Sequence, residues 1–385
     1  MPETSHLIPP PVGLYVHIPW CEKKCPYCDF NSHVASTIPE DDYVTALLKD
    51  FEVEMSGESR AIETVFIGGG TPSLFSEESI RKLLTGIRQR GELRTDAEVT
   101  MEANPSSIEA DRLRGYVDAG VTRFSLGIQS FNDKALSALG RVHSGKTARQ
   151  AIRCAAASGA TSFNLDLMHG LPGQSVENGL EDIATSLTDR PPHISWYQLT
   201  IEPNTRFYKY PPTLPVEHVL GDLEDQGVAM LDQAGYRRYE VSAWALPGEE
   251  CQHNLNYWTF GDYVAIGAGA HGKLTGSDAQ VIRYSKTRRP EDYLKETGKS
   301  RRSLRALDEV DRCGEFAMNA LRLSAGFSLE LFEARTGLEA VRIQHLLEEL
   351  QQEGLLEKSS KVKATALGWR FLDDLVGRFF DLRLH

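Results

Sequence analysis

Three cysteines lie close together near the start of the chain, at Cys21, Cys25 and Cys28. Their spacing, Cys-x3-Cys-x2-Cys in the segment CEKKCPYC, places three thiolates on one short loop. Three thiolates can bind three irons of a cubane [4Fe–4S] cluster and leave the fourth iron without a protein ligand, whereas a structural zinc ion needs four ligands. We therefore expect an iron–sulfur cluster whose open iron can bind a small chelating molecule.

A zinc site is the alternative for these cysteines, and it would need His17 or His33 as its fourth ligand. Cys-x2-Cys zinc sites usually come as a pair of such turns, and no second pair follows here. The other cysteines, Cys154, Cys251 and Cys313, are scattered along the chain, so we interpret them as free thiols.

A glycine run, GGGTP at residues 68–72, is the second motif with chemical meaning. Glycine lets the backbone approach a ligand closely and adopt positive φ, which leaves amide groups free to bind a carboxylate or another polar group. A tight turn between a strand and a helix is the alternative for this motif taken alone.

The elements that must position these motifs alternate between short β-rich runs and amphipathic helices over the first 240 residues. We expect helices at 39–55, 76–90 and 175–187, the second of them opened by Ser76 as N-cap. Right-handed crossovers would make the sheet parallel, and six units predict a partial (β/α)6 barrel, with a doubly wound sheet as the alternative. The expected strands are residues 13–19, 63–69, 98–104, 123–129, 162–170 and 194–202.

Polar residues fall at the carboxyl ends of these strands. The cysteines follow the first strand and the glycine run follows the second, while Glu102, Gln129 and Asp166 lie at or near the ends of the next three. Ligands bind at this edge in parallel α/β folds, so the set is expected to converge on one pocket. A single such residue could merely satisfy the backbone of a loop.

The cysteine motif, with an aromatic residue before its third cysteine, resembles together with GGGTP the signature of the radical S-adenosylmethionine (SAM) superfamily. The resemblance implies that SAM binds the open iron through its amino and carboxylate groups. It also implies roles for further residues: Gly69, Gly70 and Thr71 at the amino-acid end of SAM, Tyr15, Tyr27, Glu102 and Ile266 around a first SAM site, and Gln129, Arg141, Asp166 and Thr200 at the positions that hold a second SAM in oxygen-independent coproporphyrinogen III oxidases. On the residues alone, Arg141 and Asp166 could instead form an ion pair at the barrel mouth.

After a further expected strand at 237–245, the segment 250–272 concentrates four residues of another kind: His253, Asn254, Tyr257 and Trp258. Aromatic planes beside a histidine suit a flat, hydrophobic macrocycle, and imidazole is a common axial ligand of heme iron. In the alternative, His253 caps a loop and the two aromatic rings pack against the barrel. The pattern HNxxYW resembles, however, a motif typical of the HemW family of heme chaperones, which favours a role in heme binding.

Three regions are expected: a radical SAM core at 1–240, a barrel extension and linker at 241–300, and an α-rich, winged-helix-like domain at 301–385. Within the second region, we interpret residues 272–294 as a polar, turn-rich linker that covers the open barrel edge. The expected recognition helix of the winged helix carries three glutamates that would repel phosphate, so we interpret the domain as a lid or an interaction surface. These glutamates are Glu348, Glu349 and Glu353.

Charge and hydropathy indicate which partners and locations to expect. The 385 residues include 54 acidic and 42 basic side chains, a formal net charge of −12, which argues against nucleic acid as a partner. No stretch approaches the roughly 18 apolar residues of a membrane span, and the first residues lack the features of a signal peptide. We expect a cytoplasmic protein that is not integral to a membrane.

Two departures from the coproporphyrinogen III oxidases separate the functional hypotheses. The oxidases carry a further cysteine where this chain has Phe30, and a longer arm where only 14 residues precede Tyr15. Our first hypothesis is a heme chaperone that delivers heme to hemoproteins, with an electron donor for the cluster and a homodimer as further expected partners. The alternatives are an oxygen-independent coproporphyrinogen III oxidase, which decarboxylates its substrate oxidatively, and a radical enzyme acting on an unrelated substrate; whether the chain is an enzyme stays open.

Overall fold

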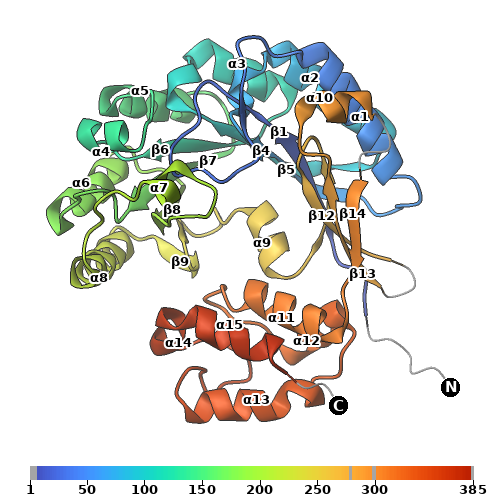
Figure 1. Cartoon of the computed structure of the whole chain (residues 1–385), viewed down its shortest axis with the longest axis vertical. Helices are drawn as coiled ribbons and strands as arrows, with labels where there is room; N and C mark the ends of the chain where they lie inside the picture. The colour runs from blue at the N-terminus through green and yellow to red at the C-terminus, as the bar shows by residue number, and fades with distance from the viewer. Residues whose placement is uncertain (1–6, 277–279, 297–300, 383–385) are drawn as a thin grey trace.

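The computed structural model describes residues 7–276, 280–296 and 301–382. Figure 1 shows two parts: an α/β part with a curved sheet and helices on its outside, and a helical C-terminal part below it. A short helix, α9 (Gln252–Trp258), lies between the two parts. None of the helices in these ranges is both long and apolar enough to cross a membrane.

The six predicted strands are confirmed and lie side by side in the order of the sequence. All neighbours among them are parallel. A doubly wound sheet would reverse its strand order at a switch point, so the sequential order supports the partial barrel. The strands are β1 (Val12–Ile18), β4 (Ile62–Gly69), β5 (Leu93–Ala103), β6 (Arg123–Gln129), β7 (Ser162–His169) and β8 (His193–Gln198).

Helices cover the convex side of this sheet (Figure 1). The predicted cap at Ser76 is confirmed, since its side chain accepts a hydrogen bond from the Ser79 amide. The main helices are α1 (Glu40–Glu54), α2 (Glu77–Arg90), α3 (Ala110–Ala119), α5 (Gly145–Ala156), α6 (Val176–Leu187) and α8 (Glu217–Gln233). Shorter pieces are β2 (Trp20–Cys21), β3 (His33–Val34), η1 (Pro72–Leu74), η2 (Pro105–Ser107), α4 (Asp133–Ala138) and α7 (Arg206–Lys209).

The main hydrophobic core lies between the sheet and these helices. Side chains alternate along a strand, so Met101 of β5 packs into this core while the next residue, Glu102, points to the other face. Close packing depends on small residues on the helices: a Cβ on Gly227 of α8 would lie 2.2 Å from the ring of Trp196. The outer core thus leaves the inner face of the strands for polar groups.

The expected single strand at 237–245 is wrong. The segment forms two short antiparallel strands, β9 (Arg237–Glu240) and β10 (Ala243–Ala245), and β10 pairs antiparallel with β8. Polar groups stabilise the turn between them, because the Arg238 guanidinium donates to the Val241 carbonyl and the Ser242 amide donates to the Glu240 carboxylate at 3.0 Å.

The linker expected at 272–294 is also wrong, because most of this segment extends the sheet. After β11 (Asp262–Ile266), which pairs parallel with β1, the chain adds β12 (His271–Thr275), β13 (Val281–Lys286), α10 (Pro290–Lys295) and β14 (Arg301–Ala306), and the three strands are antiparallel. The lysines of these strands suggested solvent exposure, yet Lys273 and Lys286 are each 1% exposed. Buried carboxylates pair with them, which a linear sequence does not reveal.

The C-terminal part has its own hydrophobic core. Antiparallel bridges between Phe327 and Val362 and between Leu356 and Ala364 make a small wing beside the helices, as the winged-helix prediction requires. The helices are α11 (Glu309–Ala320), α12 (Leu329–Thr336), α13 (Val341–Gln352), α14 (Ala366–Arg370) and α15 (Leu372–Phe380).

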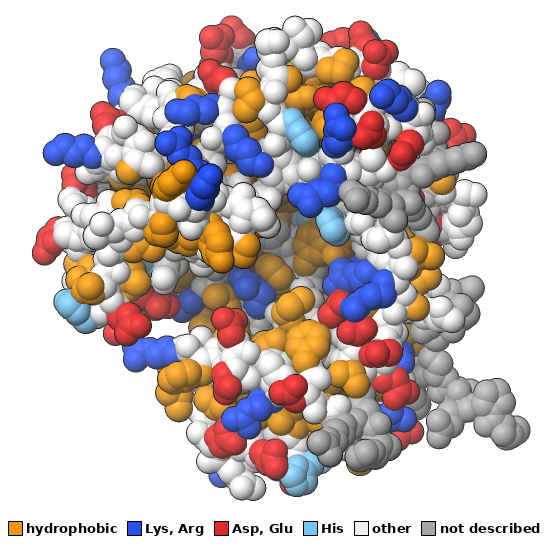
Figure 2. Space-filling view, in the orientation of Figure 1, with side chains coloured by type: hydrophobic (Ala, Val, Ile, Leu, Met, Phe, Trp, Pro, Cys, Tyr) orange, Lys and Arg blue, Asp and Glu red, His pale blue; other side chains and the backbone are white. Residues whose placement is uncertain are grey.

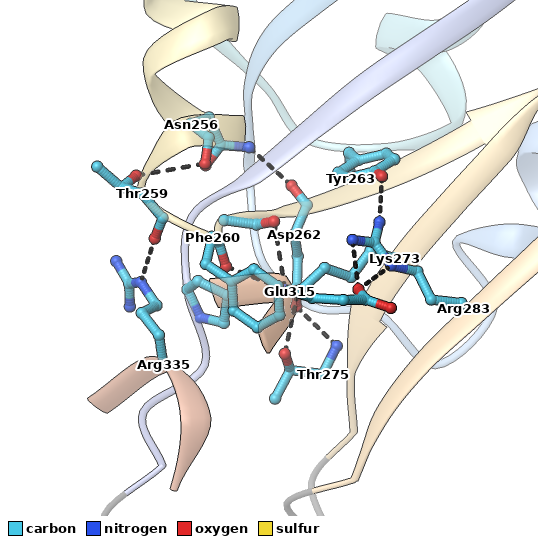
Figure 3. Close-up of polar contacts among 12 residues, drawn as sticks. Asn256, Thr259, Phe260, Asp262, Tyr263, Lys273, Thr275, Arg283, Glu315 and Arg335 are labelled. Carbon is cyan, nitrogen blue, oxygen red and sulfur yellow. Dashed lines mark hydrogen bonds and ion pairs between the residues drawn. The ribbon is translucent and has the colours of Figure 1, made fainter. Parts of the chain in front are cut away.

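A polar network joins the two parts below α9 (Figure 3). At its centre the buried Asp262 carboxylate accepts from the Lys273 ammonium at 2.8 Å and from the Thr275 amide at 2.8 Å. From the C-terminal part, Arg335 donates to the Thr259 carbonyl at 3.3 Å, and Glu315 pairs with Arg283 at 2.7 Å. The last turn of α9 is therefore tied both to the sheet and to the C-terminal helices.

Replacing Asp262 by Asn should lower the free energy of unfolding by about 3–5 kcal/mol, because the buried Lys273 ammonium would lose its carboxylate partner. Denaturant titration measures the effect. The matched control is Asp225→Asn, whose carboxylate is 69% exposed in its pair with Arg370 and should contribute little. Equal decreases in the free energy of unfolding of the two variants would show that the buried pair contributes no more to stability than the exposed one.

Candidate functional site

A cavity of about 270 Å³ lies at the carboxyl ends of the parallel strands. The convergence expected from the sequence is confirmed in its geometry, because thiols, the glycine run and polar strand ends all line this one cavity. Its lining includes Cys21, Cys25, Tyr27, Cys28, Gly69, Gly70, Thr71, Glu102, Gln129, Arg141 and Asp166.

The cysteine loop is held against the glycine run by its backbone. The Gly70 amide donates to the Ile18 carbonyl at 2.7 Å, and the Thr71 amide donates to the Trp20 carbonyl at 2.7 Å. A Cβ on Gly70 would lie 2.4 Å from the Trp20 oxygen, and one on Gly69, at φ +115°, would lie 2.5 Å from the His17 ring. Glycine is therefore needed for the close approach of the two loops, in addition to any contact with a ligand.

The donor set fits a cluster better than a single zinc ion. His17, one expected fourth zinc ligand, has both ring nitrogens engaged: Nε2 donates to the Asn31 carbonyl at 2.9 Å and Nδ1 accepts from the Tyr15 hydroxyl at 2.9 Å. Within residues 7–276, 280–296 and 301–382, no three His, Cys, Asp or Glu side chains are close enough to hold one metal ion together. The three thiols line one cavity, and a cubane would need one of them at each of three irons.

Burial raises the pKa of the Cys21 and Cys28 thiols, so iron must displace their protons when it binds. The remaining cysteines behave as predicted: Cys154, Cys251 and Cys313 are free and buried.

Two carboxylates line the side of the cavity formed by β5 and β7. Glu102 accepts from the Gly69 amide at 3.0 Å, and burial, with the Asp166 charge as a smaller cause, raises its pKa to about 7. Asp166 accepts from Ser125 at 2.9 Å and from Asn164 at 2.8 Å, and burial raises its pKa too. A cationic ligand would relieve the cost of ionising both groups.

Arg141 and Asp166 do not form the ion pair that was one expectation for them. The Arg141 guanidinium donates instead to the Gly127 carbonyl at 2.9 Å and lies 3.7 Å from the Cys25 Sγ. Gln129 has φ +66°, an uncommon backbone conformation for a residue other than glycine, and its side-chain oxygen accepts from the Tyr197 hydroxyl at 3.0 Å.

Tyr197 lines the cavity and is missing from the residues singled out in the sequence. It lies on the sixth predicted strand two residues after Ser195, which faces the same side, so the alternation of side chains along that strand was the available signal. Three expected SAM-binding residues, Tyr15, Thr200 and Ile266, are not among those that line the cavity.

The HNxxYW residues lie elsewhere, on α9. The His253 ring is 1% exposed and stacked on Phe66. Its Nδ1 is 2.7 Å from the Thr64 hydroxyl and its Nε2 is 3.0 Å from the Tyr257 hydroxyl. Burial lowers the pKa of His253 to about 3. Neither ring nitrogen of His253 is free to bind iron in this conformation. The ring is packed against the barrel, as in the alternative to a heme ligand.

The helix α9 and the cysteine cavity lie at opposite ends of the strands. Glu98 accepts from the His253 amide at 3.0 Å, and Thr64 and Glu98 both precede the ends of their strands by five residues, or about 17 Å. Asn254, Tyr257 and Trp258 are half-buried. The Arg322 guanidinium lies 4.4 Å from the Trp258 ring centre, so this side of α9 faces the C-terminal part, next to the hollow in the middle of Figure 2.

Comparison with known proteins identifies families for both the barrel and the helical C-terminal part. Residues 15–184 match the radical SAM superfamily, and residues 307–371 match the HemN C-terminal domain. The heme chaperone HemW of Haemophilus influenzae is 48% identical over 377 residues, which cover 96% of this chain and 98% of that protein. The chain belongs to the HemW family. HemW of Escherichia coli is equally similar, at 48% identity over 373 residues and 96% of this chain.

The fold of the HemW family also appears in a solved structure. Coproporphyrinogen III oxidase (HemN) from Escherichia coli, a radical SAM enzyme, superposes with a TM-score of 0.80 over 97% of this chain and 90% of that one. The sequences are 23% identical, so this likeness shows the shared fold alone. The family that HNxxYW indicated is confirmed, and so is the radical SAM barrel.

Glu102→Gln should stabilise the metal-free protein at pH 8 by about 1–3 kcal/mol relative to wild type and change little at pH 5. The pKa of Glu102 is raised from 4.5 to about 7 on folding, so its contribution to stability is present below about pH 4.5 and lost as the pH rises through 7. Denaturant titrations at both pH values measure this. Glu63→Gln, at an exposed position near the start of β4, is the control, and a Glu102 effect independent of pH would contradict the assignment.

Proposed function

We propose that this chain is a heme chaperone, which binds heme and delivers it to hemoproteins, and that it carries a [4Fe–4S] cluster and binds SAM. The observation that carries the proposal is the 48% identity with HemW proteins along nearly the whole chain. The cytoplasm as its location, an electron donor and a homodimer are parts of the same proposal.

For the cluster, we assign Cys21, Cys25 and Cys28 as the ligands. Their shared cavity supports this, together with the absence of a fourth thiol among the residues that line it. When bound, the cluster and SAM would supply one-electron chemistry at the open iron. The protein itself contributes a shielded cavity with cysteine thiols at one side and buried carboxylates at the other.

For SAM, the cavity offers groups of both charge types. The backbone of Gly69, Gly70 and Thr71 would meet its amino-acid end, and Glu102 and Asp166 would balance its cationic groups. The further assigned residues are Tyr15, Tyr27, Gln129, Arg141, Thr200 and Ile266; of these, Tyr15, Thr200 and Ile266 require a ligand that reaches beyond the cavity.

For heme, we assign the side of α9 that carries Asn254, Tyr257 and Trp258. Half-buried aromatic rings give a flat macrocycle a surface to pack against. The Arg322 guanidinium lies over the Trp258 ring and is paired with Glu240 at 2.8 Å, so a heme propionate would have to compete with that carboxylate. The ring of His253 anchors the helix to the barrel through Thr64. It would bind heme iron only after α9 leaves this position.

A second candidate function is oxygen-independent oxidation of coproporphyrinogen III. The match of residues 307–371 to the HemN C-terminal domain favours this hypothesis. Against it, the position of the oxidases' further cysteine holds Phe30, whose side chain is 60% exposed and has no redox chemistry. We therefore place heme delivery first.

Adding hemin to the anaerobically reconstituted protein should give a saturable shift of the Soret band, because the macrocycle moves from water to an aromatic surface. Trp258→Ala, which removes one such ring, should weaken the binding several-fold without loss of the cluster. Free hemin spectra at all protein concentrations would refute the chaperone function.

Coproporphyrinogen III supplied with SAM and a reductant should not be converted to protoporphyrinogen, measured by chromatography after oxidation of the products. The cluster absorbance before and after the incubation controls for loss of iron. Repeated turnover would favour the oxidase function over the chaperone.

His253→Ala should lower the free energy of unfolding by about 1–3 kcal/mol, because Thr64 and Tyr257 lose a buried hydrogen-bond partner. We also expect slower heme transfer, an intact cluster, and a Soret band at the wild-type wavelength. A displaced Soret band would instead identify His253 as an axial ligand that is reached by opening α9.

A further inference from the structure

Arg141 lies beside the thiols of the candidate cluster site. Its Nη1 lies 3.7 Å from the Sγ of Cys25, within hydrogen-bonding distance for sulfur, and its Nη2 is fixed on the Gly127 carbonyl at 2.9 Å. The second contact holds the guanidinium in place from the inner face of β6. Contacts within the protein therefore orient the guanidinium toward the sulfur of an assigned cluster ligand.

The charge of Arg141 has no counterion in the parts of the chain that the structure describes. No carboxylate lies within ion-pair distance of it there, and its Nε is buried without a hydrogen-bond partner. Burying an unpaired cation is costly, so the site is built for negative charge. Thiolates that ligate an iron–sulfur cluster supply that charge.

We propose that Arg141 is a positioning residue of the cluster: its N–H group donates to the Cys25 sulfur, and its charge keeps the reduction potential of the cluster higher than the cysteines alone would set it. This role rests on the proposed cluster and goes beyond the contact with SAM that the family resemblance implies. Hydrogen bonds to the sulfurs and local charge both set the potential of such clusters. A nearby cation stabilises the reduced form, which carries one more negative charge.

The surroundings of Cys25 make Arg141 the residue to test. Tyr27 and Arg141 flank this thiol, and the Phe207 amide holds the adjoining Pro26 carbonyl at 2.9 Å, so the loop has little freedom to compensate for a lost contact.

The test is a redox titration of the reconstituted cluster, followed by EPR and carried out without SAM. Arg141→Gln removes the charge and should shift the midpoint potential to more negative values. Arg141→Lys retains the charge but loses the planar guanidinium, whose two NH2 groups contact Cys25 and Gly127. Its midpoint potential should therefore lie between those of Arg141→Gln and wild type. Arg149→Gln, eight residues further on and packed against Phe131, is the matched control and should keep the wild-type potential.

Each outcome decides the proposal. If Arg141→Gln has the potential of the Arg149→Gln control, Arg141 has no role toward the cluster, and a loss of SAM affinity alone would assign it to SAM. If Arg141→Gln holds no cluster, the potential of Arg141→Lys decides, and a wild-type value there overturns the proposal. A wild-type protein without iron and sulfide would instead refute the proposed function itself.

Discussion

The close contact between two backbone segments, the cysteine loop after β1 and the glycine run after β4, is the constraint on which the site depends. Two amide hydrogen bonds join them, and a side chain at Gly70 would overlap the Trp20 carbonyl. The contact fixes the cysteine loop at the mouth of the barrel, beside Glu102, whose carboxylate binds the Gly69 amide. The same glycines thus build the cavity and hold one of its acids.

The barrel has a second polar region at the other end of its strands. There Glu98 and Thr64 hold α9 through the His253 amide and ring, and Asp262 with Lys273 ties the strand after α9 to the rest of the sheet. The two regions are separated by most of the length of a strand. Chemistry at the thiols and heme binding at α9 would therefore occupy opposite ends of the barrel, with Phe66 stacked between Tyr15 and His253.

Much of the barrel could be predicted from the sequence, because buried parallel strands read as continuous apolar runs and the polar residues at their ends stand out. The strands β12 and β13 could not, since Lys273 and Lys286 look exposed until their partners, Asp262 and the Asp50–Glu54 pair of α1, are known. The packed position of His253 could not be predicted for a similar reason: its hydrogen-bond partner Thr64 lies 189 residues away in the chain.

The cavity also separates charges in a way that motif spacing does not reveal. Arg141 lies against Cys25, whereas Glu102 and Asp166 lie toward β5 and β7, and neither carboxylate forms an ion pair with a residue that the structure describes. An anionic cluster at the thiols would face the guanidinium, and a ligand with cationic groups would then be drawn to the carboxylates. SAM carries such groups next to a carboxylate that can chelate iron. Under the proposed function, the opposite charges at the two sides of the cavity would match the two charge types of SAM.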